Sequence, residues 1–188
     1  MSKIIPFAAA AAYLLACAPA SSTTPPATLT SIKVCGKEFT MVYRESDAST
    51  GSVVAEYAQR GATPSTWIRL VTVYDLPPSE TPSSYIGKIA RRYETSHPGM
   101  KFSSGNSAST GEAWMDAVFV GSMHGSARFS GSVEWSFFRA MPRPSGTRVL
   151  QYSERRGYKD SPQEVYSGWD VSVLRKKLLP SLLSHQLP

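Results

Sequence analysis

Short segments in which hydrophobic and polar residues alternate follow one another along the first half of the chain. Alternation with a period of two is typical of β-strands that bury one face. It predicts strands over residues 31–34, 39–44, 53–60 and 67–75, although residues 55–59 would also suit a helical turn. The first two are close enough to form a hairpin through residues 35–37, with Phe39, Met41 and Tyr43 on one face. Pro77 follows the last of these segments and ends it, because proline cannot donate to a β-ladder.

The pattern then changes to one in which apolar residues recur every three or four positions, as on one face of an α-helix. Thr81 and Pro82 are the residues expected at an N-cap and at the first helical position. The helix should end at residues 97–99, His-Pro-Gly. Its buried face should contain Tyr85 or Ile86, Ile89, Ala90 and Tyr93.

Alternation returns in the second half of the chain and predicts an antiparallel meander of strands over residues 113–120, 133–141 and 147–155. Ser161 and Glu164 then form a capping-box pattern that starts a last helix. Pro180 should break or kink this helix near its end. Its apolar side should contain Val165, Trp169, Val173 and Leu174.

Strands and helices do not alternate in the way that builds a parallel sheet, so the expected fold class is α+β, with an antiparallel sheet flanked by two helices. Residues 30–188 should form a single domain of this kind. The order of elements loosely resembles the Mog1/PsbP-like fold, in which helices flank a curved antiparallel sheet. The resemblance concerns element order only and implies no functional residues.

The N-terminus has the layout of an export signal. Met1 to Ala16 contains Lys3, an apolar run and no acidic residue, and it is expected to be helical. A permanent transmembrane helix needs about 20 apolar residues, and this run ends sooner. It is also compatible with an ordinary signal peptide cleaved after a small-x-small pattern such as Ala16-Cys17-Ala18, or with an uncleaved buried helix.

Leu14-Leu15-Ala16-Cys17 resembles the lipobox of bacterial lipoproteins, in which the cysteine is lipidated and becomes the new N-terminus. The resemblance implies that residues 1–16 are removed, that Cys17 carries lipid, and that residues 17–29, rich in Pro, Ser and Thr, form a tether. Ala18 stands where an Asp would favour retention in the inner membrane, so the resemblance favours the outer membrane, facing the periplasm. With Cys17 lipidated, Cys35 has no partner for an intramolecular disulfide and is expected to be a partly buried small residue.

Composition agrees with a globular domain: 41% of the 188 residues are hydrophobic and 18% are charged. The formal net charge is +6, and much of the basic excess lies between Arg139 and Lys177. A basic surface attracts polyanions. Nucleic acid is a poor candidate outside the cytoplasm, so anionic lipid head groups, an acidic envelope polymer or an acidic envelope protein are the candidate partners. A solvated basic face with no partner is the alternative.

Candidate binding chemistry gathers in the connection between two predicted strands, residues 121–131, which is longer than a tight hairpin needs. Long loops on rigid scaffolds often carry binding residues, and here His124, Arg128 and Phe129 could contact a protein or a glycan. A flexible Gly/Ser turn without function is the alternative.

More demanding chemistry in the same loop has less support. A serine hydrolase could draw on Ser122, His124 and Asp116, but a nucleophile elbow is missing. A copper site could draw on Met123, His124 and Met115. Glu112 and Asp116, four apart on a strand, would lie about 13 Å apart, too far for a glycosidase pair.

The sequence therefore indicates a non-catalytic lipoprotein of the cell envelope that binds another protein or an envelope component. No catalytic residue, metal ligand set or cofactor is assigned. A lipoprotein that binds a small ligand or copper is the alternative, and a hydrolase ranks below it.

Overall fold

A computed structural model describes residues 30–63, 66–97, 100–122 and 131–186. Its centre is one antiparallel sheet of eight strands in the order β1-β2-β3-β4-β8-β7-β6-β5. The strands are β1 (Ser31–Val34), β2 (Lys37–Asp47), β3 (Ser52–Ala58), β4 (Arg69–Leu76), β5 (Lys101–Asn106), β6 (Ala113–Ser122), β7 (Gly131–Arg143) and β8 (Gly146–Tyr158). Neighbouring strands are joined mostly by short hairpins, and the connection from β4 to β5 contains a helix.

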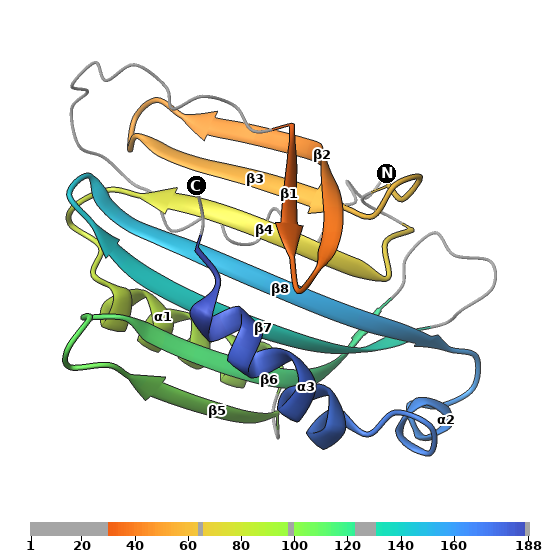
Figure 1. Cartoon of the computed structure of the whole chain (residues 1–188). Helices are drawn as coiled ribbons and strands as arrows, with labels where there is room; N and C mark the ends of the chain where they lie inside the picture. Colours follow the sequence, from red (N-terminus) through yellow and green to blue (C-terminus); the bar gives the residue numbers. More distant parts are fainter. Residues whose placement is uncertain (1–29, 64–65, 98–99, 123–130, 187–188) are drawn as a thin grey trace, which may run out of the picture.

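Helices cover both faces of this sheet (Figure 1). Helix α1 (Pro82–Ser96) packs on one face against β6 and β7, while α3 (Val171–Ser184) lies on the other face, with the single-turn α2 (Gln163–Tyr166) before it. The predicted α+β class with an antiparallel sheet is confirmed, as is the first helix. Thr81 caps α1 through a hydrogen bond from the Ser84 backbone N–H to its hydroxyl at 3.2 Å.

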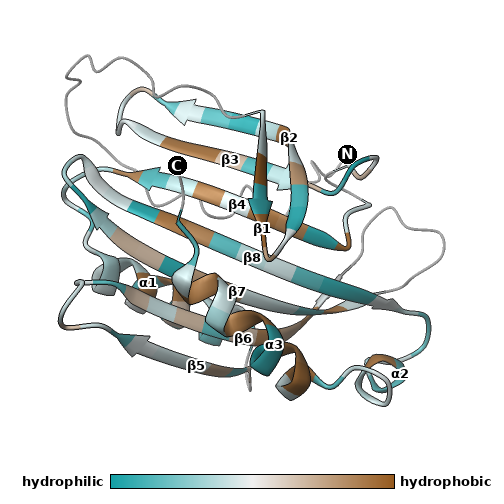
Figure 2. Cartoon of the chain, in the orientation of Figure 1, coloured by the Kyte–Doolittle hydropathy of each residue, from teal (hydrophilic) through white to brown (hydrophobic). Residues whose placement is uncertain are grey.

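Two buried clusters correspond to the two faces. Tyr85, Ile86 and Ile89 of α1 pack with small and aromatic residues of β6 and β7. Leu178 and Leu182 of α3 pack with residues of the central strands and of the β1–β2 hairpin on the opposite face. Figure 2 shows the resulting alternation of hydrophobic and hydrophilic residues along the strands. We refer below to the α1 face and the α3 face of the sheet.

The β1–β2 hairpin forms as predicted, but Tyr43 does not share a face with Phe39 and Met41. A β-bulge between Met41 and Tyr43 inserts one extra residue, so that Met41 pairs with Tyr57 and Tyr43 pairs with Glu56. An extra residue reverses the alternation beyond it. Tyr43 therefore lies on the α1 face and is partly exposed.

The prediction for the last helix needs two corrections. One continuous helix was expected after Ser161, whereas Gly168 to Asp170 separate α2 from α3 and Asp170 starts the second helix as its N-cap. Of the break or kink expected at Pro180, the break does not occur, because α3 continues to Ser184. The buried residues Leu178 and Leu182 hold the helix on both sides of this proline.

Candidate interaction surface

Helix α3 is fixed to the sheet by a buried carboxylate. Asp116 on β6 is fully buried, and its Oδ2 accepts a hydrogen bond from the Trp135 indole at 2.7 Å. The same oxygen pairs with the guanidinium of Arg175, on the inward side of α3. A buried charge is tolerated when it is paired and hydrogen-bonded. Arg175 is therefore committed to the attachment of α3 and is not part of its free surface.

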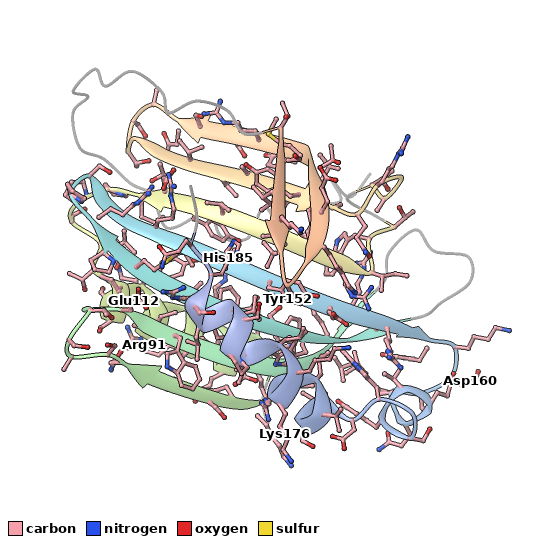
Figure 3. The ribbon with its side chains drawn as sticks, viewed as in Figure 1. Arg91, Glu112, Tyr152, Asp160, Lys176 and His185 are labelled. Carbon is pink, nitrogen blue, oxygen red and sulfur yellow. The ribbon has the colours of Figure 1, made fainter. Side chains whose placement is uncertain are left out.

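The end of α3 is held by a second ion pair, which is partly buried. Arg139 on β7 donates from Nε and Nη2 to the two carboxylate oxygens of Glu112, at 3.0 and 2.8 Å. Its Nη1 donates to the backbone carbonyls of Leu182 at 3.4 Å and His185 at 2.7 Å. Carbonyls at a helix C-terminus lack intrahelical partners, and a cation there is favourable. Figure 3 shows Glu112 beneath the end of α3, where His185 lies.

The start of α3 is capped by its own chain. The Asp170 carboxylate accepts hydrogen bonds from the backbone N–H groups of Ser172 at 2.8 Å and Val173 at 3.4 Å. The hydroxyl and backbone N–H of Ser172 hold the pKa of Asp170 below its ordinary value. Glu164 similarly accepts from three backbone N–H groups before α2, including that of Ser161 at 2.8 Å. The contacts with the sheet and the Asp170 cap thus determine which side of α3 faces outward.

The outward side of α3 combines lysines with apolar residues. Val173 is 58% exposed and Leu183 is 36% exposed, and between them Lys176 and Lys177 are exposed as well. Pro180 continues the same line, since these positions are three or four residues apart. We call Val173, Lys176, Lys177, Pro180 and Leu183 the α3 outer face. Figure 2 shows hydrophobic residues on the part of α3 that faces away from the sheet.

Helix α1 is different. Its exposed positions carry only polar residues: Ser83, Ser84, Arg91, Glu94, Thr95 and Ser96. This is the ordinary pattern for a helix packed on a sheet, with apolar residues only on the inner side. The two helices therefore present different chemistry on the two sides of the molecule, and the α3 side is the unusual one. Tyr166 of α2, which precedes α3 in the chain, is 44% exposed.

The α1 face carries a buried polar network across three neighbouring strands. Ser136 donates to Glu134 at 2.7 Å and shares a hydrogen bond of 2.6 Å with Ser153. Gln151 donates to Ser153 at 3.1 Å and accepts from the Tyr74 hydroxyl at 2.8 Å. Burial raises the pKa of Glu134, and hydrogen bonds from the two serines lower it by a smaller amount. Because both serine side chains are buried, this network joins β4, β8 and β7 and offers no exposed nucleophile.

Glu56, on β3 beside this network, is a carboxyl group with only 3% of its surface exposed. Burial raises its pKa to about 7. Its neighbours in the register are Tyr43 on β2 and Thr72 on β4. Sequence reasoning missed this residue, because a glutamate in an alternating strand is ordinarily assigned to the solvent side.

The predicted binding residues His124, Arg128 and Phe129 lie outside the residues that the structure describes, as does Cys17. The structure therefore leaves both predictions as they stand. Of the other proposed chemistry, Asp116 belongs to the attachment of α3, which removes it as the acid of a triad with Ser122 and His124.

Met115, a suggested copper ligand, is fully buried in the cluster beneath α1.

The two histidines in the described ranges are both partly buried. The ring of His97 lies 4.9 Å from that of Phe119 and 6.0 Å from that of Tyr93, and burial lowers the pKa of His97. Burial also lowers the pKa of His185, with a further contribution from Arg139. Over the described ranges, no three His, Cys, Asp or Glu side chains gather as metal ligands would.

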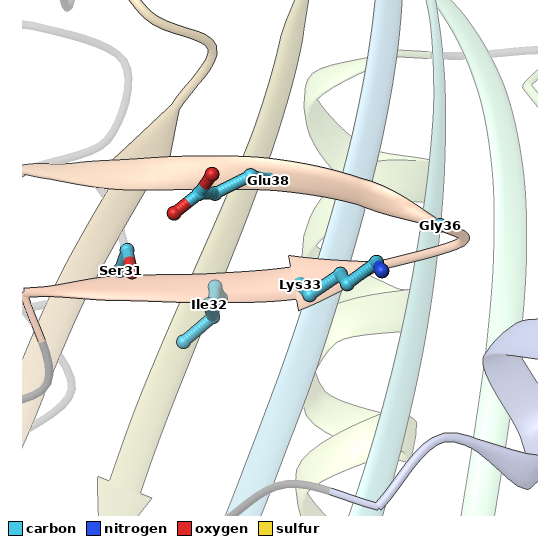
Figure 4. A pocket seen from close by; sticks show the side chains of 5 residues that line it. All are labelled: Ser31, Ile32, Lys33, Gly36 and Glu38. Atoms are coloured by element: carbon cyan, nitrogen blue, oxygen red, sulfur yellow. The ribbon is translucent and has the colours of Figure 1, made fainter.

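Cys35 lies at the tip of the β1–β2 hairpin, is half-buried, and forms no disulfide with another described residue. Beside it is an open hollow of about 600 Å³, lined by Ser31, Ile32, Lys33, Gly36 and Glu38 (Figure 4). Lys33 and Glu38, which line it, are exposed, and its walls come from a single hairpin. The hollow therefore lacks the buried polar groups that orient a ligand.

Sequence reasoning found the basic run at residues 175–177 but placed Val173 on the buried side of a single helix. The Asp170 cap begins a new helix and changes which residues face the sheet, so Val173 points outward.

In the described part of the chain, no helix combines the length and the apolar composition needed to cross a bilayer. In comparisons with known proteins, the chain matches no family model, no curated protein and no solved structure.

Proposed function

We propose that this protein is a lipid-anchored, non-catalytic binding module of the bacterial envelope, held at the outer membrane through Cys17. The observation that supports a binding role is the α3 outer face, where exposed apolar residues flank two exposed lysines. Exposed apolar patches that are rimmed by polar residues are typical of interaction surfaces. The rigid attachment of α3 keeps this surface in one orientation.

The proposed role contains no catalytic step. The two acidic residues of and just before β6 are both engaged: Asp116 binds Arg175 and Trp135, and Glu112 binds Arg139. Each is engaged in holding α3, so its substitution should affect stability before any chemistry. Anchoring rests on the sequence Leu14-Leu15-Ala16-Cys17 and on the uncharged segment that follows it.

Intact mass and membrane fractionation of the natively expressed protein test the anchor, with Cys17→Ser and Cys35→Ser compared with the wild type. We expect the wild type and Cys35→Ser to begin at residue 17, to carry added acyl mass and to fractionate with membranes, because several buried acyl chains make anchoring stable. Cys17→Ser should lose both properties. An unmodified Cys17 in a protein that leaves the membrane fraction would overturn the proposal.

A further inference from the structure

We infer that the α3 outer face binds the surface of an anionic lipid bilayer, so that the domain lies against the membrane instead of extending from its tether. This inference rests on the proposed function, because the lipid on Cys17 supplies the proximity. The first observation is the spacing of Val173, Lys176, Lys177, Pro180 and Leu183, which forms a continuous exposed line along α3. Protein surfaces bind an anionic bilayer through apolar residues that enter the interface and basic residues that reach the head groups, and this line contains both kinds.

The lysines are available for an external anion. Lys176 and Lys177 are exposed, and neither forms an ion pair with a residue in the described ranges. The Asp170 carboxylate at the start of α3 accepts hydrogen bonds from backbone N–H groups and also interacts electrostatically with Lys176, without forming an ion pair with it. Glu164, within α2, is engaged with backbone N–H groups. Near an anionic bilayer, each such lysine strengthens binding roughly fivefold.

The apolar members explain why we choose a bilayer over an acidic protein or polymer. Val173 and Leu183 stand at the two ends of the line and would enter the boundary between head groups and acyl chains, while the lysine side chains extend to the phosphates. Tyr166, an exposed residue of α2 four positions before the Asp170 cap, is of the type that favours this boundary. A soluble polyanion would use the lysines and leave these three side chains in water.

The position of the tether allows the contact. Strand β1, which follows the tether directly, packs in the same cluster as α3: Ile32 and Val34 share it with Leu178 and Leu182. Figure 1 shows β1 and α3 on the same side of the sheet, with α1 on the far side. Residues 18–29 can span up to roughly 35–40 Å when extended. The lipid can therefore be inserted while α3, and not α1, touches the bilayer.

Hydrogen exchange of the lipidated protein in vesicles tests this inference. We would compare vesicles of phosphatidylcholine alone with vesicles that also contain phosphatidylglycerol. The test variant is K176E/K177E, and R91E/R92E is the control, since it changes an adjacent basic pair by the same charge on α1, at the opposite face of the sheet. Residues 171–184 should exchange more slowly only in the anionic vesicles, and α1 should exchange equally in both.

We expect K176E/K177E to lose this protection and R91E/R92E to keep it. Added salt should also abolish it in the wild type, because the contact is electrostatic. Equal exchange of α3 in the two kinds of vesicle would overturn the inference. Equal loss of protection in K176E/K177E and R91E/R92E would also overturn it. The same holds if Lys176 and Lys177 capture an acidic protein while lipid charge has no effect on exchange.

If mass analysis shows that Cys17 carries no lipid, the anchor fails and the surface can still be tested separately. The full chain would then be added to the same vesicles, and its partitioning measured by co-sedimentation. K176E/K177E should weaken partitioning into anionic vesicles by at least about 25-fold relative to R91E/R92E, from roughly fivefold for each lysine. No difference between the two variants would overturn the inference in this form as well.

Discussion

Asp116 on β6 and Arg175 on α3 are 59 residues apart in the chain, and their side chains form an ion pair between the sheet and the helix. The carboxylate is fully buried and also accepts a hydrogen bond from Trp135, whereas the guanidinium is partly exposed. The pair thus joins the interior of the sheet to a helix whose other side faces solvent. Its importance lies in orientation, because it determines which residues of α3 point outward.

Arg175→Met should destabilise the fold, since it leaves the Asp116 carboxylate buried with only the Trp135 indole as a partner. Removing one member of a buried pair typically costs on the order of 3 kcal/mol of unfolding free energy. Urea denaturation followed by tryptophan fluorescence measures the unfolding free energy of the variant and of the wild type. Asp116→Asn combined with Arg175→Met should cost much less than the sum of the single changes. A cost of Arg175→Met below about 1 kcal/mol would show that the pair does not hold α3.

Local patterns were sufficient for the strands whose alternation is regular and whose turns contain glycine or proline. They failed at β5, whose sequence Lys-Phe-Ser-Ser-Gly-Asn has no β-branched residue and was not predicted as a strand. Pairing along β6 makes it a strand, and the Trp114 ring covers Gly105 from the neighbouring strand. Such cross-strand contacts cannot be seen in the pattern of a single strand.

Gly146 follows the turn between β7 and β8 with φ of +131°, and a Cβ there would lie 2.0 Å from the carbonyl oxygen of Leu76. Gly146→Ala should therefore cost roughly 3 kcal/mol or more, because backbone atoms must move. Gly51→Ala is the control: its φ is +72°, but nothing lies within 4 Å of the added carbon. That change should cost only about 1 kcal/mol. Thermal denaturation of the two variants compares them, and equal costs would refute the steric argument.

Cys35 and Gly36 form the two-residue turn of the β1–β2 hairpin, both with positive φ. Burial raises the pKa of the Cys35 thiol, against a hydrogen bond with Ser181 of α3. Since the thiolate is the reactive form, the folded protein should react with a thiol reagent at pH 8 more slowly than the protein unfolded in urea. Only one cysteine should react in the lipidated protein, and Cys35→Ser should abolish the reaction. Equal rates in the folded and unfolded states would contradict the expected protection.

The candidate surface was only half predictable. The lysines of α3 can be seen in the sequence as a basic run. Which apolar residues share the outer face with them depends on where the helix begins. Asp170 fulfils the role of N-cap, and the resulting rotation brings Val173 outward. Arg175, within the same run, is drawn inward by Asp116. Which cations are free and which are structural is therefore decided by tertiary contacts.

Glu56 should make stability fall as pH rises. Its pKa is raised by burial from 4.5 to about 7 in the folded state, so between these values the folded protein holds a proton that the unfolded chain has released. Its contribution to stability is therefore greatest below pH 4.5 and is lost as pH rises through 7, by up to about 3 kcal/mol. Glu56→Gln should abolish this loss, and Glu38→Gln, at an exposed position of β2, should retain it. Urea denaturation at pH 5 and pH 8 measures the unfolding free energy of each protein. If the wild type loses no more stability than Glu56→Gln between pH 5 and pH 8, the prediction is wrong.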